Sequence, residues 1–178
     1  MSCPITYGYS LPCKSTAGVQ AVYISTYSTG LTYTIDSSAS GATSSYGTIT
    51  GFGGTVGTFY HFQLPNQVIS FTQDGASSDE NGTTFVTQTL ELTLYSLTQP
   101  IVELINILAR GNWRIILLDQ NGNYWLMNKQ NPVTVTTYTP GLGKAFGDLN
   151  GAVITFQGME PYAANQVSSA AFAALTVV

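Results

Sequence analysis

The sequence predicts a mainly β domain in which one α-helix packs on a sheet. Short segments that alternate β-branched or aromatic residues with small polar ones recur along the chain, separated by clusters of Gly and Ser. Only one segment carries apolar residues at helical spacing. A length of 178 residues suits one domain with a sizeable core. We therefore expect residues 1–178 to form a single domain.

The first half of the chain reads as short strands followed by a polar segment. Its alternating stretches are "VQAVYIST", "LTYTID", "YGTITGF" and "GTFYHFQL". The segment "TQDGASSDENGTT", residues 72–84, carries three of the nine acids and shows no periodicity, which predicts a loop. Because this segment is too polar to pack alone, we expect it to lie between subunits or rings and to order on assembly. Residues 1–83 thus make a β-rich N-terminal half that includes the long loop 72–84.

A long strand and the single helix follow. The stretch "FVTQTLELTLYS", residues 85–96, alternates cleanly and predicts a strand. Either Ser96 with Gln99, or Thr98 alone, can cap a helix in which Pro100 fits the first turn. The apolar residues of this helix recur at helical spacing, and Arg110 and Gly111 close it; they are Ile101, Leu104, Ile105 and Leu108.

A hairpin and one further pair of strands complete the core. In "NWRIILLDQNGNYWLMN" the pair Asn121-Gly122 suits a type I′ turn between two strands. Residues 133–138 and the stretch "AVITFQGME" predict strands on either side of a loop rich in glycine. We therefore expect a strand-helix-hairpin-strand core over residues 84–162. Residues 163–178 form a C-terminal arm that lies on a neighbour or on the sheet.

The low charge of the chain is its most unusual compositional property. Charged residues make up 8% of the sequence, against about 25% in ordinary soluble domains. A free monomer of this kind is poorly protected against association, so the composition favours a subunit of an assembly. The basic residues are too scattered to hold a nucleic-acid backbone tightly; they are Lys14, Arg110, Arg114, Lys129 and Lys144.

Nothing in the sequence predicts membrane insertion or a metal site. Its apolar runs are short, and the start "MSCPITYGYS" lacks the charged and apolar regions of a signal peptide. We expect the protein to be made and assembled in a cytoplasm. Cys3 and Cys13 have a spacing that allows a bridge, but two cysteines in a reducing compartment are more often free thiols, and both states stay open.

The stretch "GKAFGDLNGAVITFQGMEP" raises the question of a phosphate-binding loop. Such a loop needs a Lys followed by Ser or Thr and then a helix that offers its N-terminus to the anion. Here Lys144 is followed by Ala145 and Phe146, and a strand comes next. We interpret Lys144 and Asp148 as residues that serve loop geometry and assembly. Gly147 is expected to make a turn, with a positive φ as one possibility.

Other candidates for chemistry are weak. His61 is the only histidine and stands among aromatic residues, which favours a strand histidine over a catalytic base. Asp74, Asp79 and Glu80 lack the spacing of a calcium loop. The sequence therefore predicts no catalytic, cofactor-binding or metal-binding residue, and no cofactor.

Two further groups of residues are candidates for binding or cleaving a sugar. A glycosidase needs two opposed carboxylates, which Glu91, Glu103, Asp119 and Glu160 could supply only through the fold. Trp113, Tyr124 and Trp125 could stack on a sugar or a base, but beside an apolar helix one face of these aromatics more often belongs to the core.

One family resemblance joins these features. The order of a long strand, the helix "TQPIVELINILARG", the hairpin "NWRIILLDQNGNYWLMN" and the ending "GLGKAFGDLNGAVITFQGMEP" resembles the tail-tube proteins of tailed phages and their tube-like virion relatives. The resemblance covers residues 84–162, and the ending is similar to virion proteins of phages that infect Bacteroidetes-type bacteria. Residues 1–83 match less recognisably.

The resemblance implies a β-sandwich or barrel of the tail-tube type with one flanking helix and no catalytic residues. It implies that subunits form rings of six, or of a multiple of six, by joining their sheets into one inner barrel. Rings would then stack, or dock onto neighbouring tail or neck proteins of the virion, and DNA would pass through the lumen without specific binding. Tube subunit and single-layer ring protein both stay open.

A monomeric sugar-binding or adhesin β-sandwich is the alternative from another class. The Tyr and Trp content and the glycosylation sequon at Asn81 support it, but the chain lacks a targeting signal. Low charge and exposed strand edges favour the ring, because copies of one chain can satisfy each other's edges.

Overall fold

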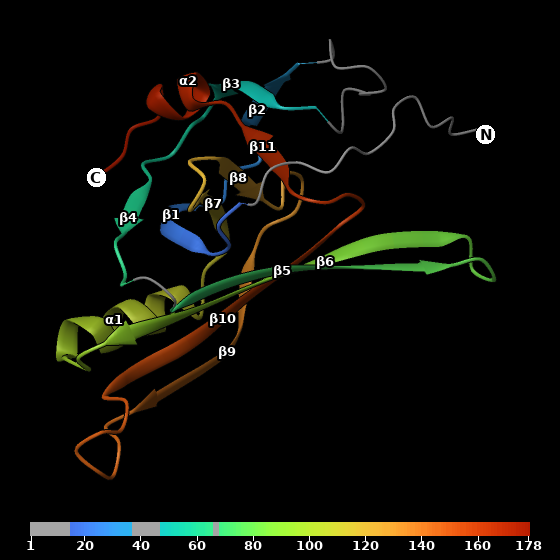
Figure 1. Cartoon of the computed structure of the whole chain (residues 1–178). Helices are drawn as coiled ribbons and strands as arrows, with labels where there is room; N and C mark the ends of the chain where they lie inside the picture. The colour runs from blue at the N-terminus through green and yellow to red at the C-terminus, as the bar shows by residue number, and fades with distance from the viewer. Residues whose placement is uncertain (1–14, 37–46, 66–67) are drawn as a thin grey trace.

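The structure is a computed structural model that describes residues 15–36, 47–65 and 68–178. Cys3, Cys13 and Lys14 lie outside the described residues. The described chain is mainly β, as the alternating segments predicted. It consists of two sheets with two short helices, whereas the sequence predicted one helix. Figure 1 shows the seven-stranded sheet above the four-stranded one.

The larger sheet holds its strands in the order β2-β3-β11-β8-β7-β1-β4. Its central strands β1 and β7 are buried along most of their length, because apolar residues on both faces find partners. The bounds of its strands are β1 (Val19–Thr26), β2 (Leu31–Ile35), β3 (Ile49–Gly54), β4 (Tyr60–Phe62), β7 (Trp113–Asp119), β8 (Tyr124–Met127) and β11 (Asn165–Val167).

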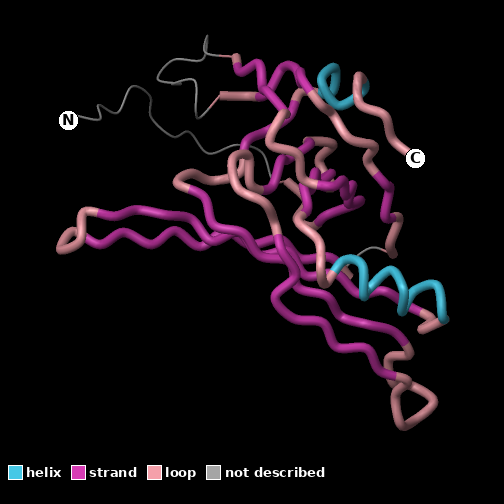
Figure 2. Tube along the Cα trace, turned by 180° about the vertical axis from the view of Figure 1, so that it is seen from behind, coloured by secondary structure: helices cyan, strands magenta, loops and turns pink. Residues whose placement is uncertain are grey.

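The smaller sheet has the order β5-β6-β10-β9, and every neighbouring pair is antiparallel. β5 and β6 are its longest hairpin and extend well beyond the rest of the molecule (Figures 1 and 2). The bounds of its strands are β5 (Ile69–Ser78), β6 (Thr83–Tyr95), β9 (Thr134–Gly141) and β10 (Gly151–Glu160).

The prediction of a loop over residues 72–84 is wrong. Residues 72–78 continue β5 and residues 83–84 begin β6, with Thr72 paired to Thr89 and Ser78 paired to Thr83. The ladder continues outward from the buried start of β5, so backbone hydrogen bonds keep these polar residues extended without any apolar face. Only residues 79–82 turn, and Gly82 has a φ of 62° there. Sequence periodicity misses such a strand because both its faces are polar.

The helix α1 (Gln99–Leu108) lies where its apolar spacing predicted. Thr98 is its N-cap residue and Pro100 stands in the first turn, while the side chain of Thr98 makes no capping hydrogen bond. Ile105 and Leu108 are buried in the core. Among the helices of the described residues, none is long and apolar enough to cross a membrane.

The hairpin of β7 and β8 is confirmed, but its turn is not type I′. That turn requires positive φ at both central residues, and here Gly122 has a φ of 82° whereas Asn121 is absent from the positive-φ residues of the described chain. The Gly122 N–H instead donates to the Asp119 carbonyl. Asp119 also accepts hydrogen bonds from the backbone of Asn121 and Asn123, which stabilises a longer turn.

The C-terminal residues pack on their own subunit and do not extend away from it. β11 joins β8 and β3 in the larger sheet. The helix α2 (Ser169–Ala173) follows, capped by Ser168, and its Phe172 stacks on Tyr124 with ring centroids 4.0 Å apart. The sequence left two positions open for this segment, a neighbour or the sheet. Its small and aromatic residues place it on the sheet because they bury apolar area there.

Two apolar clusters hold the layers together. The first lies between the sheets and includes Val22, Leu92, Ile115 and Ile154. The second lies on the other face of the larger sheet and includes Ile116 and the residues under α2. Adjacent residues of β7 therefore serve different clusters, as the period of a strand requires.

Candidate assembly surface

One face of the smaller sheet is covered by no other element of the part of the chain that the structure describes. Along β6, Leu90 and Leu92 point into the core, whereas Glu91 points the opposite way. The register shows which residues share the side of Glu91 on the other three strands. We call this side the outer face; its residues with side chains are exposed or half-buried and are Ser70, Thr72, Asp74, Ala76, Ser78, Thr83, Phe85, Thr87, Thr89, Glu91, Thr93, Tyr95, Thr134, Thr137, Thr139, Val153, Thr155, Gln157 and Met159.

The outer face is rich in threonine and has no cation. None of the four strands contains a Lys, Arg or His. Its two charged residues are the carboxylates Asp74 and Glu91, while Glu160 of β10 is buried on the other side. A phosphate backbone therefore finds no positive side chain on this face.

Both edges of the smaller sheet are unpaired within the described chain. β5 pairs on one side only, with β6, and β9 pairs on one side only, with β10. Most residues of β9 are exposed. An exposed strand edge presents unpaired N–H and C=O groups and is a template for another strand.

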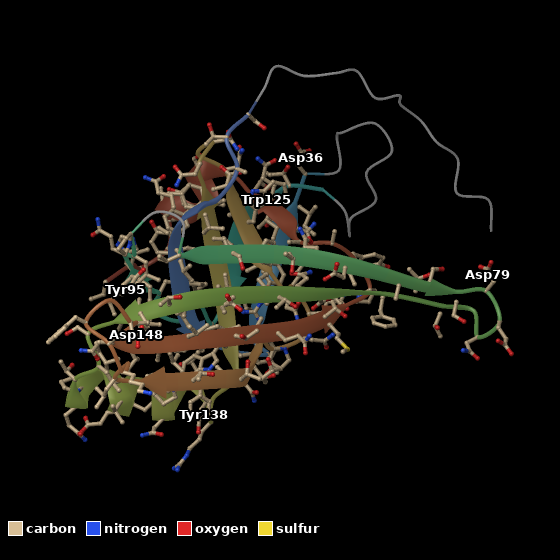
Figure 3. All side chains as sticks on the ribbon, turned by 60° about the horizontal axis from the view of Figure 1, so that its bottom comes forward. Asp36, Asp79, Tyr95, Trp125, Tyr138 and Asp148 are labelled. Atoms are coloured by element: carbon tan, nitrogen blue, oxygen red, sulfur yellow. The ribbon has the colours of Figure 1, made fainter. Side chains whose placement is uncertain are left out.

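The outer part of the β5–β6 hairpin, residues 73–88, is here called the arm. Most of its side chains are exposed, and Ser77 and Thr84 hydrogen-bond across it with an Oγ to Oγ1 distance of 3.1 Å. Asp79 and Glu80 make its tip acidic. Figure 3 places Asp79 and Asp148 at opposite ends of the sheet.

At that opposite end, residues 142–150 form the glycine loop. One carboxylate oxygen of Asp148 accepts hydrogen bonds from the backbone N–H groups of Ala145 and Lys144, both at 2.8 Å. These bonds lower the pKa of Asp148 because they favour its ionised form. The donors that a phosphate would need are therefore occupied by a side chain of the loop itself. This geometry agrees with the interpretation that Asp148 serves the loop.

The glycine of this loop that has a positive φ is Gly143, whereas Gly147 was considered for that conformation from the sequence. Gly143 has a φ of 72°, and a Cβ added there would stand 2.7 Å from the Cβ of Asp148. Gly147 has no positive φ, and a Cβ added to it meets nothing within 4 Å. The side chain of Phe146 next to it is fully exposed.

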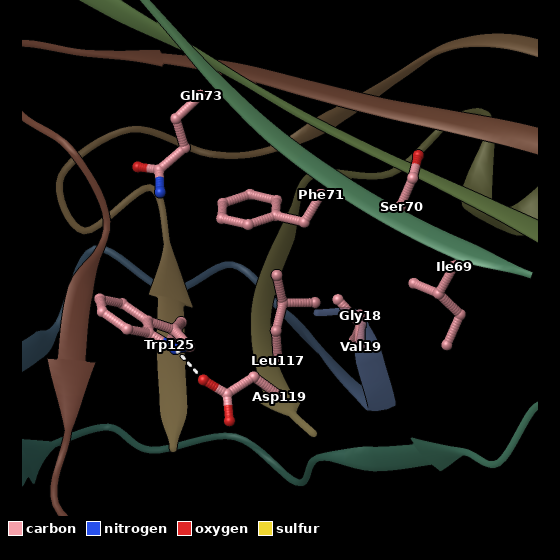
Figure 4. A pocket seen from close by; sticks show the side chains of 9 residues that line it. All are labelled: Gly18, Val19, Ile69, Ser70, Phe71, Gln73, Leu117, Asp119 and Trp125. Atoms are coloured by element: carbon pink, nitrogen blue, oxygen red, sulfur yellow. Dashed lines mark hydrogen bonds between the residues drawn. The ribbon is translucent and has the colours of Figure 1, made fainter. Parts of the chain in front are cut away.

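A pocket of about 370 Å³ opens beneath the β5 edge, between the two sheets (Figure 4). Its walls are mainly apolar and come from both sheets. Residues that line it include Val19, Ile69, Phe71, Leu117 and Trp125.

Asp119 is the one carboxylate in this pocket, and the β7–β8 turn already uses it. Burial alone would raise its pKa, but hydrogen bonds from Asn123, Trp125 and Asn121 outweigh burial and lower it. The Trp125 indole N–H donates to Asp119 at 3.0 Å. Both carboxylate oxygens are thus occupied, and the carboxylate mainly orients the turn and the indole ring.

The structure does not bring the other candidate residues together. His61 lies on β4 and stacks on Tyr23 with ring centroids 4.8 Å apart, as expected for a strand histidine. Glu91 lies on the outer face, and Glu103 accepts a hydrogen bond from Gln99 on α1. Glu160 accepts hydrogen bonds from two backbone N–H groups. In the described residues no three His, Cys, Asp or Glu side chains are placed to share a metal ion.

The three aromatic residues that could stack on a ligand pack against two different core clusters. Trp113 and Trp125 pack against the cluster between the sheets, and Tyr124 packs against the other cluster. The Trp113 indole N–H donates to the carbonyl of Leu108. The expectation that one face of these rings belongs to the core is thus in agreement with the structure.

A buried polar group that the sequence did not reveal joins the segments that follow β1 and β8 of the larger sheet. Arg114 is buried, donates to the carbonyls of Lys129 and Ser28, and lies 4.7 Å from the centre of the Tyr27 ring. Burial lowers the pKa of Arg114, and the nearby Tyr27 opposes that shift. Sequence periodicity does not reveal this role. In a strand, alternation assigns Arg114 to one side of the sheet but does not show that it is buried or which groups it bonds to.

Comparison with known proteins identifies no relative: no family model, no curated protein and no solved structure matches the chain.

Proposed function

We propose that the protein is a non-enzymatic structural subunit of a phage virion, whose smaller sheets join into a ring or stacked tube that conducts DNA. The observation that carries this proposal is a four-stranded sheet with two unpaired edges and an outer face without cations. The tail-tube resemblance of residues 84–162 supports the same assignment.

The direction of the strands suits a closed ring. Neighbours in the order β5-β6-β10-β9 are all antiparallel, so β5 and β9 run in opposite directions. When β9 of one copy lies beside β5 of the next, that new pair is antiparallel as well. Both edges of the smaller sheet are then paired, so the ring of smaller sheets leaves no edge of its own open. A ring of six subunits, or of a multiple of six, follows from the resemblance.

The outer face suits the wall of a lumen. Threonine hydroxyls and two carboxylates per subunit face inward, and the absence of cations lets DNA slide without being held. The arm and the glycine loop lie at opposite ends of the sheet, where they reach the rings above and below or the neighbouring tail and neck proteins.

The sugar-binding alternative lacks a comparable observation. Trp113, Tyr124 and Trp125 pack against core clusters, and the carboxylate nearest to Trp125 is occupied by the β7–β8 turn. No aromatic platform with polar partners remains among them.

The assembly is tested by electron microscopy and light scattering on the purified protein. We expect rings or tubes with a central hole, and a mass that rises with concentration. A strictly monomeric species at high concentration contradicts the proposal.

The role of the lumen is tested by adding a cation to the outer face. Thr155→Arg should make the assembled protein retain double-stranded DNA in a salt-dependent way. Thr32→Arg, on an exposed position of β2 in the other sheet, is the control and should retain less. Equal retention by the two variants would argue that the outer face does not line the channel.

A further inference from the structure

Tyr138 ends an apolar row that crosses the smaller sheet. Ile69, Leu92, Ile154 and Tyr138 are paired in register from strand to strand, so all four side chains lie on the core side of the sheet. The first three are buried, whereas Tyr138 on the edge strand β9 is 46% exposed. Nearly half of this large aromatic side chain is thus open to solvent in one subunit.

A mainly apolar pocket, suited to an aromatic side chain, lies at the opposite edge of the same sheet. The pocket beneath β5 lies on the same core side, since Ile69 and Phe71 line it, and its volume is about 370 Å³. That volume is within the range of about 300–1,000 Å³ that takes small organic molecules, so one aromatic side chain fits. In Figure 4, Phe71, Leu117 and Trp125 surround this space.

We propose that Tyr138 of one subunit fills the pocket beneath β5 of the next subunit. This inference rests on the proposed ring, in which β9 of one copy pairs with β5 of its neighbour. Paired residues of two antiparallel strands share a face, and closing a barrel staggers the strands. Any even shift in register keeps Tyr138 on the core side, and the pocket runs along three core-side positions of β5: Ile69, Phe71 and Gln73.

The pocket also offers a polar partner for the phenol. The side-chain oxygen of Gln73 accepts a hydrogen bond from Ala164 N–H at 2.7 Å, so its amide nitrogen is left on the other side. Figure 4 shows that nitrogen directed toward Trp125. An aromatic ring in an apolar pocket with a hydrogen bond at its polar end is a common anchor of protein interfaces.

Removal of the ring tests the contact. Tyr138→Ala should raise the concentration of half-maximal assembly at least about tenfold, as expected for a central aromatic anchor. Tyr138→Phe keeps the ring and should raise it much less. Tyr60→Ala, an exposed tyrosine on β4 of the other sheet, is the matched control and should leave assembly unchanged.

A cross-link tests the position directly. Cys3 and Cys13 are first replaced by Ser, and Tyr138→Cys is combined with Gln73→Cys. We expect a flexible reagent that joins two thiols to give linked chains of subunits, because it spans the space left by the two shortened side chains, and we expect no linked chains from either single variant. Circular dichroism confirms that each variant is folded.

The two proposals fail in distinguishable ways. If the wild-type protein does not assemble, the proposed ring is overturned and the tyrosine contact with it. If the wild type assembles, while Tyr138→Ala assembles equally well and the cysteine pair forms no cross-link, the contact is overturned and the ring stands.

Discussion

The two sheets of this protein differ in how completely one subunit buries them. In the seven-stranded sheet, β1 and β7 contact an apolar cluster on each face. In the four-stranded sheet one face packs on the core, and no element of the described residues covers the outer face. Both faces of β1 and β7 are thus buried within one chain.

This difference separates stability from assembly. Burial of the apolar side chains of the larger sheet contributes to the free energy of folding, while the threonines of the outer face contribute little to it. Within the described residues both edges of the smaller sheet are also unpaired, and an exposed edge favours pairing with another strand. The predictions below test this division, beginning with the largest expected effect.

Truncation of a residue buried in the larger sheet should cost the most. Ile116 of β7 is fully buried, so Ile116→Ala should lower the free energy of unfolding by about 2–5 kcal/mol. Thr155→Ala on the outer face should change it by less than about 0.5 kcal/mol. Urea unfolding of the monomer measures both. Similar losses for the two variants would contradict the comparison of the sheets.

A close contact between the sheets should be nearly as sensitive. Gly158 of β10 lies against the side chain of Asn128, which is buried after β8, and a Cβ at position 158 would collide with that amide. Gly158→Ala should therefore lower the free energy of unfolding by about 1–3 kcal/mol. Gly75→Ala in the arm meets nothing within 4 Å and is the control. An unchanged free energy of unfolding for Gly158→Ala would show that the two sheets can move apart here at little cost.

The glycine loop should respond weakly and locally. Gly143→Ala should lower the free energy of unfolding by about 1 kcal/mol, because the positive φ disfavours a side chain. Gly147→Ala should be neutral, since its φ is not positive and its surroundings are open. Urea unfolding separates the two variants, and a larger loss at Gly147 would refute the assignment of the turn.

The pH response of the loop follows from Asp148. Its lowered folded-state pKa means that the hydrogen bonds to Ala145 and Lys144 are present above the ordinary pKa of aspartate. They are lost as the pH falls through the lowered value. Amide proton shifts of Ala145 and Lys144 in NMR spectra should follow this titration. If these amide shifts do not change with pH in this window, the hydrogen bonds from the two amides to the Asp148 carboxylate are ruled out.

Lys144 should have the smallest effect on folding. Lys144→Ala should leave the free energy of unfolding within about 0.5 kcal/mol, because only its backbone N–H is used in the loop. We expect no saturable ATP or GTP binding by the wild type in equilibrium dialysis. Binding that disappears in Lys144→Ala would restore the phosphate-loop interpretation.

Sequence reasoning was most accurate where burial is one-sided. The helix at residues 99–108 and the alternating strands β6 and β10 were predicted because a buried face leaves a periodic apolar pattern. The arm was missed because both its faces are polar, and the C-terminal segment was left undecided because its small apolar residues favour no period. The turn at Asn121-Gly122 was expected to be the most common two-residue type, but Asp119 stabilises a longer one.

The sequence by itself determined the mainly β class, the position of the helix and the absence of cations from four strands. These properties depend on the identity and local order of residues, which packing does not change. Only the tertiary structure decided that these strands form one sheet, that Glu91 and the threonines share its outer face, and that Tyr138 and the pocket beneath β5 lie on the same side at opposite edges. The physical reason is that strand pairing joins residues far apart in the chain, and the register of that pairing sets the face of every side chain.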